Sequence, residues 1–452
     1  FPLPPGRTAM PSLLRRAGLR ALVALGSLLL PAALPGLALH AQEHGATPEA
    51  IALRADRMLD VRTGEVVRDV TVLVEGATIR AVNPGSLPAG TAVLELGDVT
   101  LLPGFIDMHT HLAYDIGPDW VARIVTRETE GDGAIRALLN ARRTLDAGFT
   151  TVRDVGGAAV IPLARAVERG AVPGPHIFSA RSSLSITGGH CDLTTGFSPN
   201  VSPEREDNGV ANGPWEVVEA VRHQIKHGAK VIKVCATAGV LSLEGPVGAQ
   251  QYTAEELRAA VEEAARHGVR VAAHAHGAQG ILAAVEAGVT SIEHGSQLTD
   301  EILAAMKARG TWLVPTSYLA DRIDLTGQPQ LIRDKAADIL PQARASLRRA
   351  VAAGVPIAFG TDAGVFPHGE NAGEFAVYVA AGMTPLAALQ TATVNAARAL
   401  EVEDRGEIRP GLLADLVAVP GDPLQDITVT EDVRFVMVGG RVVKHPPAGA
   451  GR

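Results

Sequence analysis

Two histidines separated by one residue, His109 and His111, stand in the segment Pro-Gly-Phe-Ile-Asp-Met-His-Thr-His. Alternate residues of a β-strand project to the same side, so this spacing places two imidazoles next to each other. Neutral imidazole is a common ligand of zinc and other divalent metals. A chain with 14 histidines can contain one such pair by chance, so the pair alone predicts only half of a metal site.

Four further residues that could bind metal follow in sequence order. Each stands at the end of an apolar, β-branched run, as in Lys-Val-Ile-Lys-Val and Ser-Ile-Glu-His-Gly. These residues are Lys233, His274, His294 and Asp362. Hydrophobic packing does not explain six ligand-type residues at successive strand ends. The sequence therefore predicts one metal centre to which all six contribute.

Four more residues are considered for contacting a substrate, three of them with a defined role. His276 shares a strand face with His274, so the residues themselves leave open which of the two binds metal. His190 follows two glycines in a predicted loop and could reach a substrate, with a solvated loop histidine as the alternative. Tyr252 precedes a predicted helix and could bind a carboxylate or simply pack. His368 is a further loop candidate without a defined role.

Strand-like runs alternate with helical patterns in the central part of the chain, which is typical of βα units around a parallel sheet. The clearest helix covers 254–267, where Thr253 and Glu256 form a capping box, and another begins at Thr384-Pro385. Eight strand-like runs are centred near residues 105, 151, 177, 231, 271, 291, 313 and 357. Eight units fit a (β/α)8 TIM barrel, in which functional residues lie at the C-terminal ends of strands. A doubly wound open sheet is the alternative, but it would separate the first and last strands.

The two ends of the chain predict a smaller domain. Short strand-like runs separated by turn residues occur before residue 102 and return after residue 413. We therefore expect both ends to form one small β-sandwich-like domain beside the barrel. The predicted boundaries are 42–102 and 403–446 for this domain, 103–402 for the barrel and 447–452 for a disordered tail.

Residues 1–41 predict an export signal, which has no part in the mature fold. Arg15, Arg16 and Arg20 precede an apolar stretch over 21–39, and small residues near its end offer cleavage points. The paired arginines also resemble a twin-arginine signal. A membrane anchor is the alternative, but two prolines interrupt the short apolar stretch. We therefore expect a periplasmic or secreted protein without a stable membrane anchor.

Charge and cysteine content argue against several classes of protein. The formal net charge is −8 and no cluster of Lys and Arg stands in the body of the chain, so nucleic acid is a poor partner. Two cysteines, Cys191 and Cys235, are too few for a disulfide framework. Cys235 follows Lys233 by two residues, and we expect a core or supporting residue near the site rather than a catalytic thiol.

The ligand order His-x-His, Lys, His, His, Asp resembles the binuclear members of the amidohydrolase superfamily. The segment Leu-Pro-Gly-Phe-Ile-Asp and the split β domain match as well. Further motifs resemble the branch related to Xaa-Pro dipeptidases and imidazolonepropionases, which includes amidases that hydrolyse ochratoxin A. These motifs are Ser-Ile-Thr-Gly-Gly-His190, His274-Ala-His276-Gly and Thr-Asp362-Ala-Gly.

This resemblance implies two divalent metal ions, with Zn²⁺ as the default, bridged by a carbamylated Lys233. It assigns His109, His111 and Asp362 to one metal and His274 and His294 to the other, and it leaves His276 near the substrate. A carbamate suits the chemistry, since an ammonium cannot bind a cation and a buried, unpaired lysine is costly. Relatives commonly form homo-oligomers, often octamers.

The expected reaction is hydrolysis of a small-molecule amide or dipeptide beside a terminal carboxylate, as in dipeptidases, carboxypeptidases and amidases of N-acyl amino acids such as ochratoxin A. Water between two Zn²⁺ ions has a pKa lowered towards about 7, so a metal-bridging hydroxide can attack the carbonyl. Asp362 would then pass a proton to the leaving nitrogen, and Lys233 would support the metals. His190 or His276 would stabilise the oxyanion.

Three alternatives compete with this hypothesis. A cyclic-amide hydrolase of the imidazolonepropionase, hydantoinase or dihydroorotase kind would use the same metal ligands with another pocket. A mononuclear deaminase would lack the lysine of the fourth strand and would use a nearby glutamate, which is not found at the position expected on the fifth strand. A binding or scaffold protein on a degenerate barrel would have no need to keep all six ligands.

Overall fold

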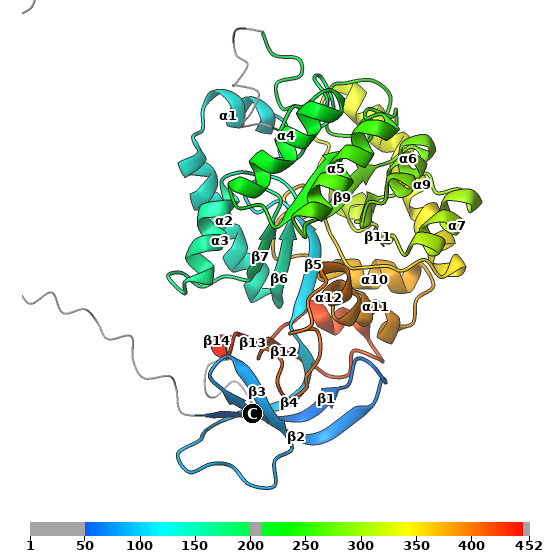
Figure 1. The fold of residues 1–452 in the computed structure, drawn as a ribbon. Helices are drawn as coiled ribbons and strands as arrows, with labels where there is room; N and C mark the ends of the chain where they lie inside the picture. The colour runs from blue at the N-terminus through cyan, green and yellow to red at the C-terminus, as the bar shows by residue number, and fades with distance from the viewer. Residues whose placement is uncertain (1–49, 199, 201–208, 446–452) are drawn as a thin grey trace, which may run out of the picture. The chain divides into compact units, whose positions relative to one another are not determined.

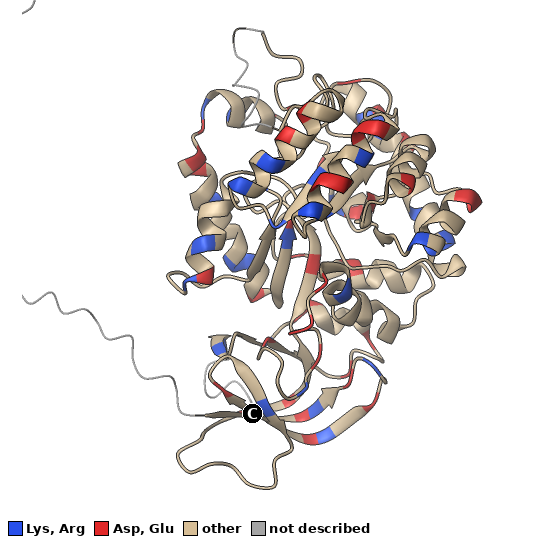
Figure 2. Ribbon diagram, viewed as in Figure 1, with Lys and Arg blue, Asp and Glu red and all other residues tan. Residues whose placement is uncertain are grey.

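The computed structural model describes residues 50–198, 200 and 209–445 (Figure 1). The predicted export signal and the predicted tail lie outside the described residues. Figure 2 shows Lys and Arg interspersed with Asp and Glu along the outer helices. Within the described ranges, every helix is too short or too polar to cross a membrane.

Strands from both ends of the chain form one seven-stranded mixed sheet, in the order β14-β13-β12-β4-β1-β2-β3. β4 pairs in parallel with β1 on one side and antiparallel with β12 on the other. The strands are β1 (Ile51–Leu59), β2 (Val66–Glu75), β3 (Thr78–Val82), β4 (Ala92–Pro103), β12 (Leu416–Pro420), β13 (Phe435–Val438) and β14 (Arg441–Lys444). Buried apolar side chains such as Leu53, Leu101 and Phe435 form the core of this sheet.

The central part of the chain alternates strands and helices around two parallel sheets. One sheet has the order β5-β6-β7 and the other the order β11-β10-β9-β8. The strands are β5 (Phe105–Thr110), β6 (Phe149–Asp154), β7 (His176–Ser179), β8 (Val231–Cys235), β9 (Arg270–Ala275), β10 (Ser291–His294) and β11 (Trp312–Val314). An isolated parallel bridge joins Leu184, in the segment that follows β7, to Val234 of β8.

Helices pack around these sheets (Figure 1). In the described part of the chain they are α1 (Trp120–Thr126), α2 (Glu130–Asp146), α3 (Val160–Glu168), α4 (Gly213–Lys226), α5 (Ala254–Arg266), α6 (Ala278–Ala287), α7 (Asp300–Arg309), α8 (Leu319–Arg322), α9 (Gln330–Ala353), α10 (Gly373–Ala380), α11 (Pro385–Thr391), α12 (Val394–Leu400) and the 3₁₀ helix η2 (Ile427–Glu431). The predicted capping box of α5 is present, because Thr253 and Glu256 each accept from the other's backbone N–H. The predicted N-cap of α11, Thr384, is present as well.

The run near Ile357 is not a regular strand, although the sequence predicts eight strands. On one side Leu313 N donates to Pro356 O, and on the other Met108 N donates to Phe359 O. Pro356 has no N–H to donate, and the described residues show only an isolated bridge at Ile357. The segment still lies between β11 and β5. It therefore brings the first and last strand-like runs together, which the open-sheet alternative would not do.

Candidate metal centre

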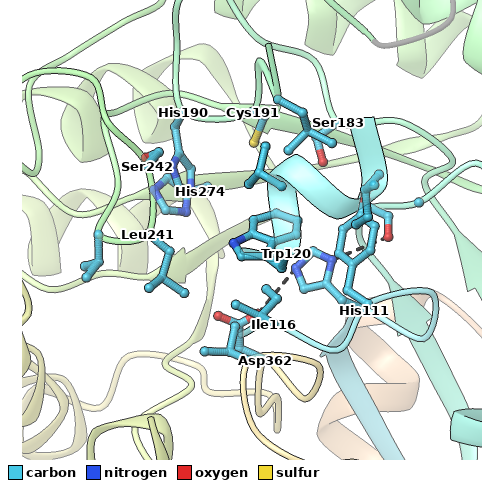
Figure 3. A pocket seen from close by; sticks show the side chains of 18 of the residues that line it. His111, Ile116, Trp120, Ser183, His190, Cys191, Leu241, Ser242, His274 and Asp362 are labelled. Carbon is cyan, nitrogen blue, oxygen red and sulfur yellow. Dashed lines mark hydrogen bonds and ion pairs between the residues drawn. The ribbon is translucent and has the colours of Figure 1, made fainter. Parts of the chain in front are cut away.

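The predicted metal ligands come together at the C-terminal ends of strands. They are His109 in β5, His111 just after it, Lys233 in β8, His274 in β9, His294 at the end of β10 and Asp362 after the run near Ile357. A cavity of about 570 Å³ opens onto all six side chains. Figure 3 shows His111 and Asp362 joined by an ion pair on one side of this cavity and His274 beside His190 on another.

Ligand atoms converge in two groups of three, and in each group they lie within 4.8 Å of one another. The β5 group consists of His109, His111 and Asp362, and the β9–β10 group consists of His274, His276 and His294. Within the β5 group, Asp362 Oδ1 is 3.4 Å from His109 Nε2 and 3.3 Å from His111 Nε2. His276, which the sequence predicts to contact the substrate, thus lies close to two predicted metal ligands, His274 and His294.

A buried ion pair lies behind the β5 group. His109 Nδ1 donates to Glu293 Oε2 at 2.7 Å, and Arg153 Nη2 donates to Glu293 Oε1 at 2.7 Å. Burial alone would raise the pKa of Glu293, but Arg153 and His109 lower it to about 2. The ionised carboxylate keeps the proton of the His109 imidazole on Nδ1. The lone pair on Nε2 is therefore free to bind a metal. Sequence reasoning missed both residues, although a glutamate directly before a ligand histidine on an inner strand is a readable signal.

A second buried carboxylate connects β5 to the segment that carries Asp362. Asp107 accepts from Thr361 Oγ1 at 2.6 Å, from Asn371 Nδ2 at 2.8 Å and from His109 N at 3.0 Å. Burial raises the pKa of Asp107 to about 6 against these hydrogen bonds. The network holds two ligands of the β5 group at a fixed separation.

Hydroxyl groups lie behind the β9–β10 group. The Nδ1 atoms of His276 and His294 are each 2.7 Å from a hydroxyl, that of Ser296 and that of Thr316. These contacts orient the two rings and direct Nε2 away from the hydroxyls. Both supporting residues are buried and uncharged.

Backbone strain coincides with two predicted ligands. His294 has a φ of 69° and Asp362 a φ of 65°, in the left-handed region that non-glycine residues rarely adopt. Such conformations cost about 1–3 kcal/mol each and cluster at functional sites. Thr316, which supports His294, has a φ of 50°. Strain at both ligand-bearing turns points to a constraint other than packing.

Two buried polar atoms test whether the residues fit a metal. Within the described chain, His274 Nε2 and Asp362 Oδ1 are buried and have no hydrogen-bond partner. Buried polar atoms are nearly always hydrogen-bonded, so His274 Nε2 needs a partner, and Asp362 Oδ1 is held only by the long contacts of 3.4 and 3.3 Å to His109 and His111 described above. Imidazole nitrogen and carboxylate oxygen are ligands that Zn²⁺ and its neighbours accept. The donor set therefore fits divalent metal ions.

Lys233 is buried beside both groups. Its side chain is 3% exposed, and the carboxylates of Glu293 and Asp362 act on its ammonium electrostatically. It acts electrostatically on His109 in one group and on His274 and His294 in the other. Burial lowers the pKa of Lys233 to about 8, so its neutral amine form is far more populated than in an exposed lysine.

The residues predicted to contact substrate lie in different places relative to the cavity. His190 lines the cavity and stacks on His274, with ring centroids 4.1 Å apart. Tyr252 does not line the cavity: it is 2% exposed and its hydroxyl donates to Ala211 O. His368 is also buried, and its Nε2 is 3.2 Å from the backbone carbonyl oxygen of His111.

Cys191 and Cys235 form a disulfide that closes 44 residues of sequence, which composition alone did not predict. This bond removes both thiols, so a catalytic thiol is excluded. It joins the residue after His190 to the end of β8, and both cysteines line the cavity. The disulfide therefore ties the loop of His190 to the strand of Lys233.

The remaining wall of the cavity is largely apolar. Tyr114 stacks on His111 with ring centroids 5.5 Å apart, and Trp120 packs on Tyr114. Other apolar lining residues are Ile116, Val240, Leu241, Leu319, Ile323 and Ile339. Arg136 also lines the cavity, but it is paired with Glu128 at 2.5 Å. The cavity thus suits a substrate with a large apolar part.

Comparison with known proteins gives one consistent result. Residues 100–443 match the amidohydrolase family. The chain is 35% identical to an ochratoxinase from Aspergillus niger over 372 residues, covering 77% of this chain and 76% of that protein. It is 28% identical to an imidazolonepropionase from Cutibacterium acnes over 386 residues, covering 80% and 89%. A crystal structure of a Xaa-Pro dipeptidase with methionine in the active site superposes with a TM-score of 0.83 at 38% identity, covering 88% and 100%.

Proposed function

The chain belongs to the amidohydrolase family and is a hydrolase of amide bonds, and from this premise we propose a binuclear metal enzyme that cleaves a peptide or amide bond beside a terminal carboxylate. The observation that carries the proposal is the pair of three-ligand groups with the buried Lys233 in the same cavity. Similarity to an ochratoxinase and to a Xaa-Pro dipeptidase supports an open-chain substrate.

The central strands close into a (β/α)8 barrel in this proposal. Support comes from both gaps between the two parallel sheets. Leu184 bridges to Val234 at one gap, and the segment near Ile357 lies between β11 and β5 at the other. Closure explains why ligands from the first and last strand-like runs meet at one end. The seven-stranded sheet is then the separate small domain.

Two divalent cations, Zn²⁺ by default, would be held by the β5 group and by His274 and His294. Lys233 would serve as a ligand to both cations as a carbamate: its neutral amine adds CO₂ and releases one proton, which gives a single negative charge shared by two oxygens. When bound, the cations supply an activated water and polarise the scissile carbonyl. His276 is then free to contact the substrate or to complete its group.

The chain's own residues would move the protons and hold the substrate. Asp362 Oδ1 faces the space between its two histidines, so it can accept a proton from the attacking water and pass it to the leaving nitrogen. His190 lines the cavity beside His274 and can donate a hydrogen bond to the substrate carboxylate or the developing oxyanion. The apolar wall holds the rest of the substrate and limits access of water.

Export and self-association complete the proposal. The signal-like residues 1–41 support a periplasmic or secreted location. A disulfide beside the site is consistent with an oxidising compartment. Homo-oligomer formation is proposed from the resemblance to the binuclear amidohydrolases.

Metal analysis and a substrate panel test the function. Protein supplied with zinc and bicarbonate should hold about two metal equivalents per chain; a smaller amount favours a mononuclear or degenerate barrel. The panel contains Xaa-Pro dipeptides, N-acyl amino acids including ochratoxin A, and cyclic amides. Hydrolysis confined to cyclic amides would support the alternative that similarity to an imidazolonepropionase keeps open.

A further inference from the structure

A buried lysine outside the metal centre makes an unusual set of contacts. Lys335 lies on α9 and is 6% exposed. Its ammonium donates to the backbone carbonyls of Gly239, Ser242 and Glu244 at 3.3, 2.9 and 2.7 Å. All three carbonyls belong to the β8–α5 loop, which we define as residues 236–253. An ammonium has three N–H donors, so Lys335 uses its whole capacity on this loop.

The same loop holds the side chain of His190. His190 Nδ1 is 2.6 Å from Ser242 Oγ and 3.6 Å from Glu244 Oε1. Glu244 Oε1 in turn accepts from Ser242 Oγ at 2.7 Å and from Gly239 N at 2.9 Å. The residues whose carbonyls bind Lys335 are therefore the residues that orient the imidazole.

His190 is confined on its other sides as well. Its backbone N donates to Gln251 Oε1 at 3.0 Å, from the far end of the β8–α5 loop. A Cβ on Gly239 would lie 2.2 Å from the imidazole, so only glycine leaves room for the ring. Among the described residues, Nε2 of His190 makes no hydrogen bond, and the ring lies against His274 at the cavity wall. Nε2 is the atom left for a substrate.

We infer that Lys335 is a positioning residue for His190, acting through the β8–α5 loop from α9. The inference rests on the proposed function, in which His190 contacts the substrate. Apolar packing is the competing explanation for how the loop is held, since Val240 packs with Ala336 and Ile339 of α9. Methionine at position 335 keeps the apolar stem and removes the three hydrogen bonds. Lys335→Met therefore distinguishes positioning by hydrogen bonds from positioning by apolar packing.

Hydrogen–deuterium exchange tests the inference without any need for turnover. In metal-loaded Lys335→Met, amides of 239–251 and 188–192 should exchange about 10-fold faster or more than in the unmodified protein. Lys307→Met is the matched control, because Lys307 also donates to a backbone carbonyl, that of Ala353, far from His190. Unchanged exchange in Lys335→Met, or the same increase in the control, would overturn the inference.

A double-mutant cycle with His190→Ala gives the catalytic readout. Lys335→Met should lower kcat about 10-fold when His190 is present and by less than about 2-fold in His190→Ala. Equal factors in both backgrounds would show that Lys335 acts on stability alone. If Lys335→Met does not fold, Lys335→Gln replaces it in the same cycle, because an amide with two N–H donors on a shorter side chain cannot make all three hydrogen bonds. If no panel substrate is hydrolysed, the proposed function fails while the exchange result still decides the role of Lys335.

Discussion

The two ligand groups of this chain are supported in different ways. Behind the β5 group lie charges, namely the Glu293–Arg153 ion pair and the Asp107 network. Behind the β9–β10 group lie the hydroxyls of Ser296 and Thr316. An ionised carboxylate on one ring nitrogen makes the other a stronger electron donor, whereas a hydroxyl mainly fixes the orientation of the ring. We therefore expect the β5 group to bind its metal more tightly.

Replacement of Asp362, the carboxylate of the β5 group, should have the largest effect on catalysis. Asp362→Asn keeps the shape of the side chain but removes the proton acceptor, so kcat should fall by about 10³-fold. The measurement is kcat on a panel substrate with metal content determined in parallel. Asp300→Asn, at the exposed start of α7, is the control. Near-normal turnover in Asp362→Asn would remove this residue from the mechanism.

Replacement of Lys233, which lines the cavity together with both groups, should have the next largest effect. Lys233→Met has a similar length but cannot form a carbamate, so the chain should retain fewer than about two metal equivalents and lose most of its activity. Elemental analysis of protein prepared with zinc and bicarbonate checks this, with Lys307→Met as control. Full metal occupancy in Lys233→Met would contradict a bridging carbamate.

Neutralising the charge behind the β5 group should weaken one metal site selectively. Glu293→Gln should reduce metal affinity there by about 10–100-fold. It should also destabilise the fold by up to about 3–5 kcal/mol, because Arg153 stays buried without its partner. Competition with a chelator measures the first effect and denaturant unfolding the second.

A matched control exists for this change on α5. Glu263 accepts from Arg222 and Arg266 at 2.6 Å each and from His267, outside the centre. Glu263→Gln should alter stability without changing metal affinity. Equal loss of metal affinity in both variants would mean that stability, rather than the carboxylate behind His109, governs binding.

The smallest effect is expected behind the β9–β10 group. Thr316→Val removes one neutral hydrogen bond to His294 with little change in shape, so affinity should fall by no more than about 10-fold. Chelator competition measures it, and Thr391→Val removes a buried hydroxyl bonded to Ala388 O as the control. If Thr316→Val lost more metal affinity than Glu293→Gln, the expectation that the β5 group binds its metal more tightly would be wrong.

The sequence predicts local features that depend on neighbouring residues. The helix at 254–267 and its capping box are visible because Thr253 and Glu256 are three residues apart. The ligand residues are visible because each ends an apolar run. The surroundings of Tyr252 could not be predicted, since its position before a helix does not show that its hydroxyl donates to Ala211 O.

Features that depend on distant pairing could not be predicted. The Cys191–Cys235 disulfide and the contact of Arg153 with Glu293 join residues on different strands or loops. The eighth run looks like a strand in sequence, but Pro356 deprives it of a donor and only isolated bridges form. Lys335 carries no motif, because its partners are backbone carbonyls about 90 residues away.

Cys191 and Cys235 would be free thiols in a chain made in a reducing cytosol. Both line the cavity, and Cys235 follows Lys233 by two residues on the same strand. Thiolates are soft ligands that bind zinc well, so a reduced chain offers metal a competing set of donors beside the two histidine groups. Metal counted in a cytosolic preparation then includes ions held by sulfur, and an oxidised preparation is the sample in which occupancy reports on the histidine groups.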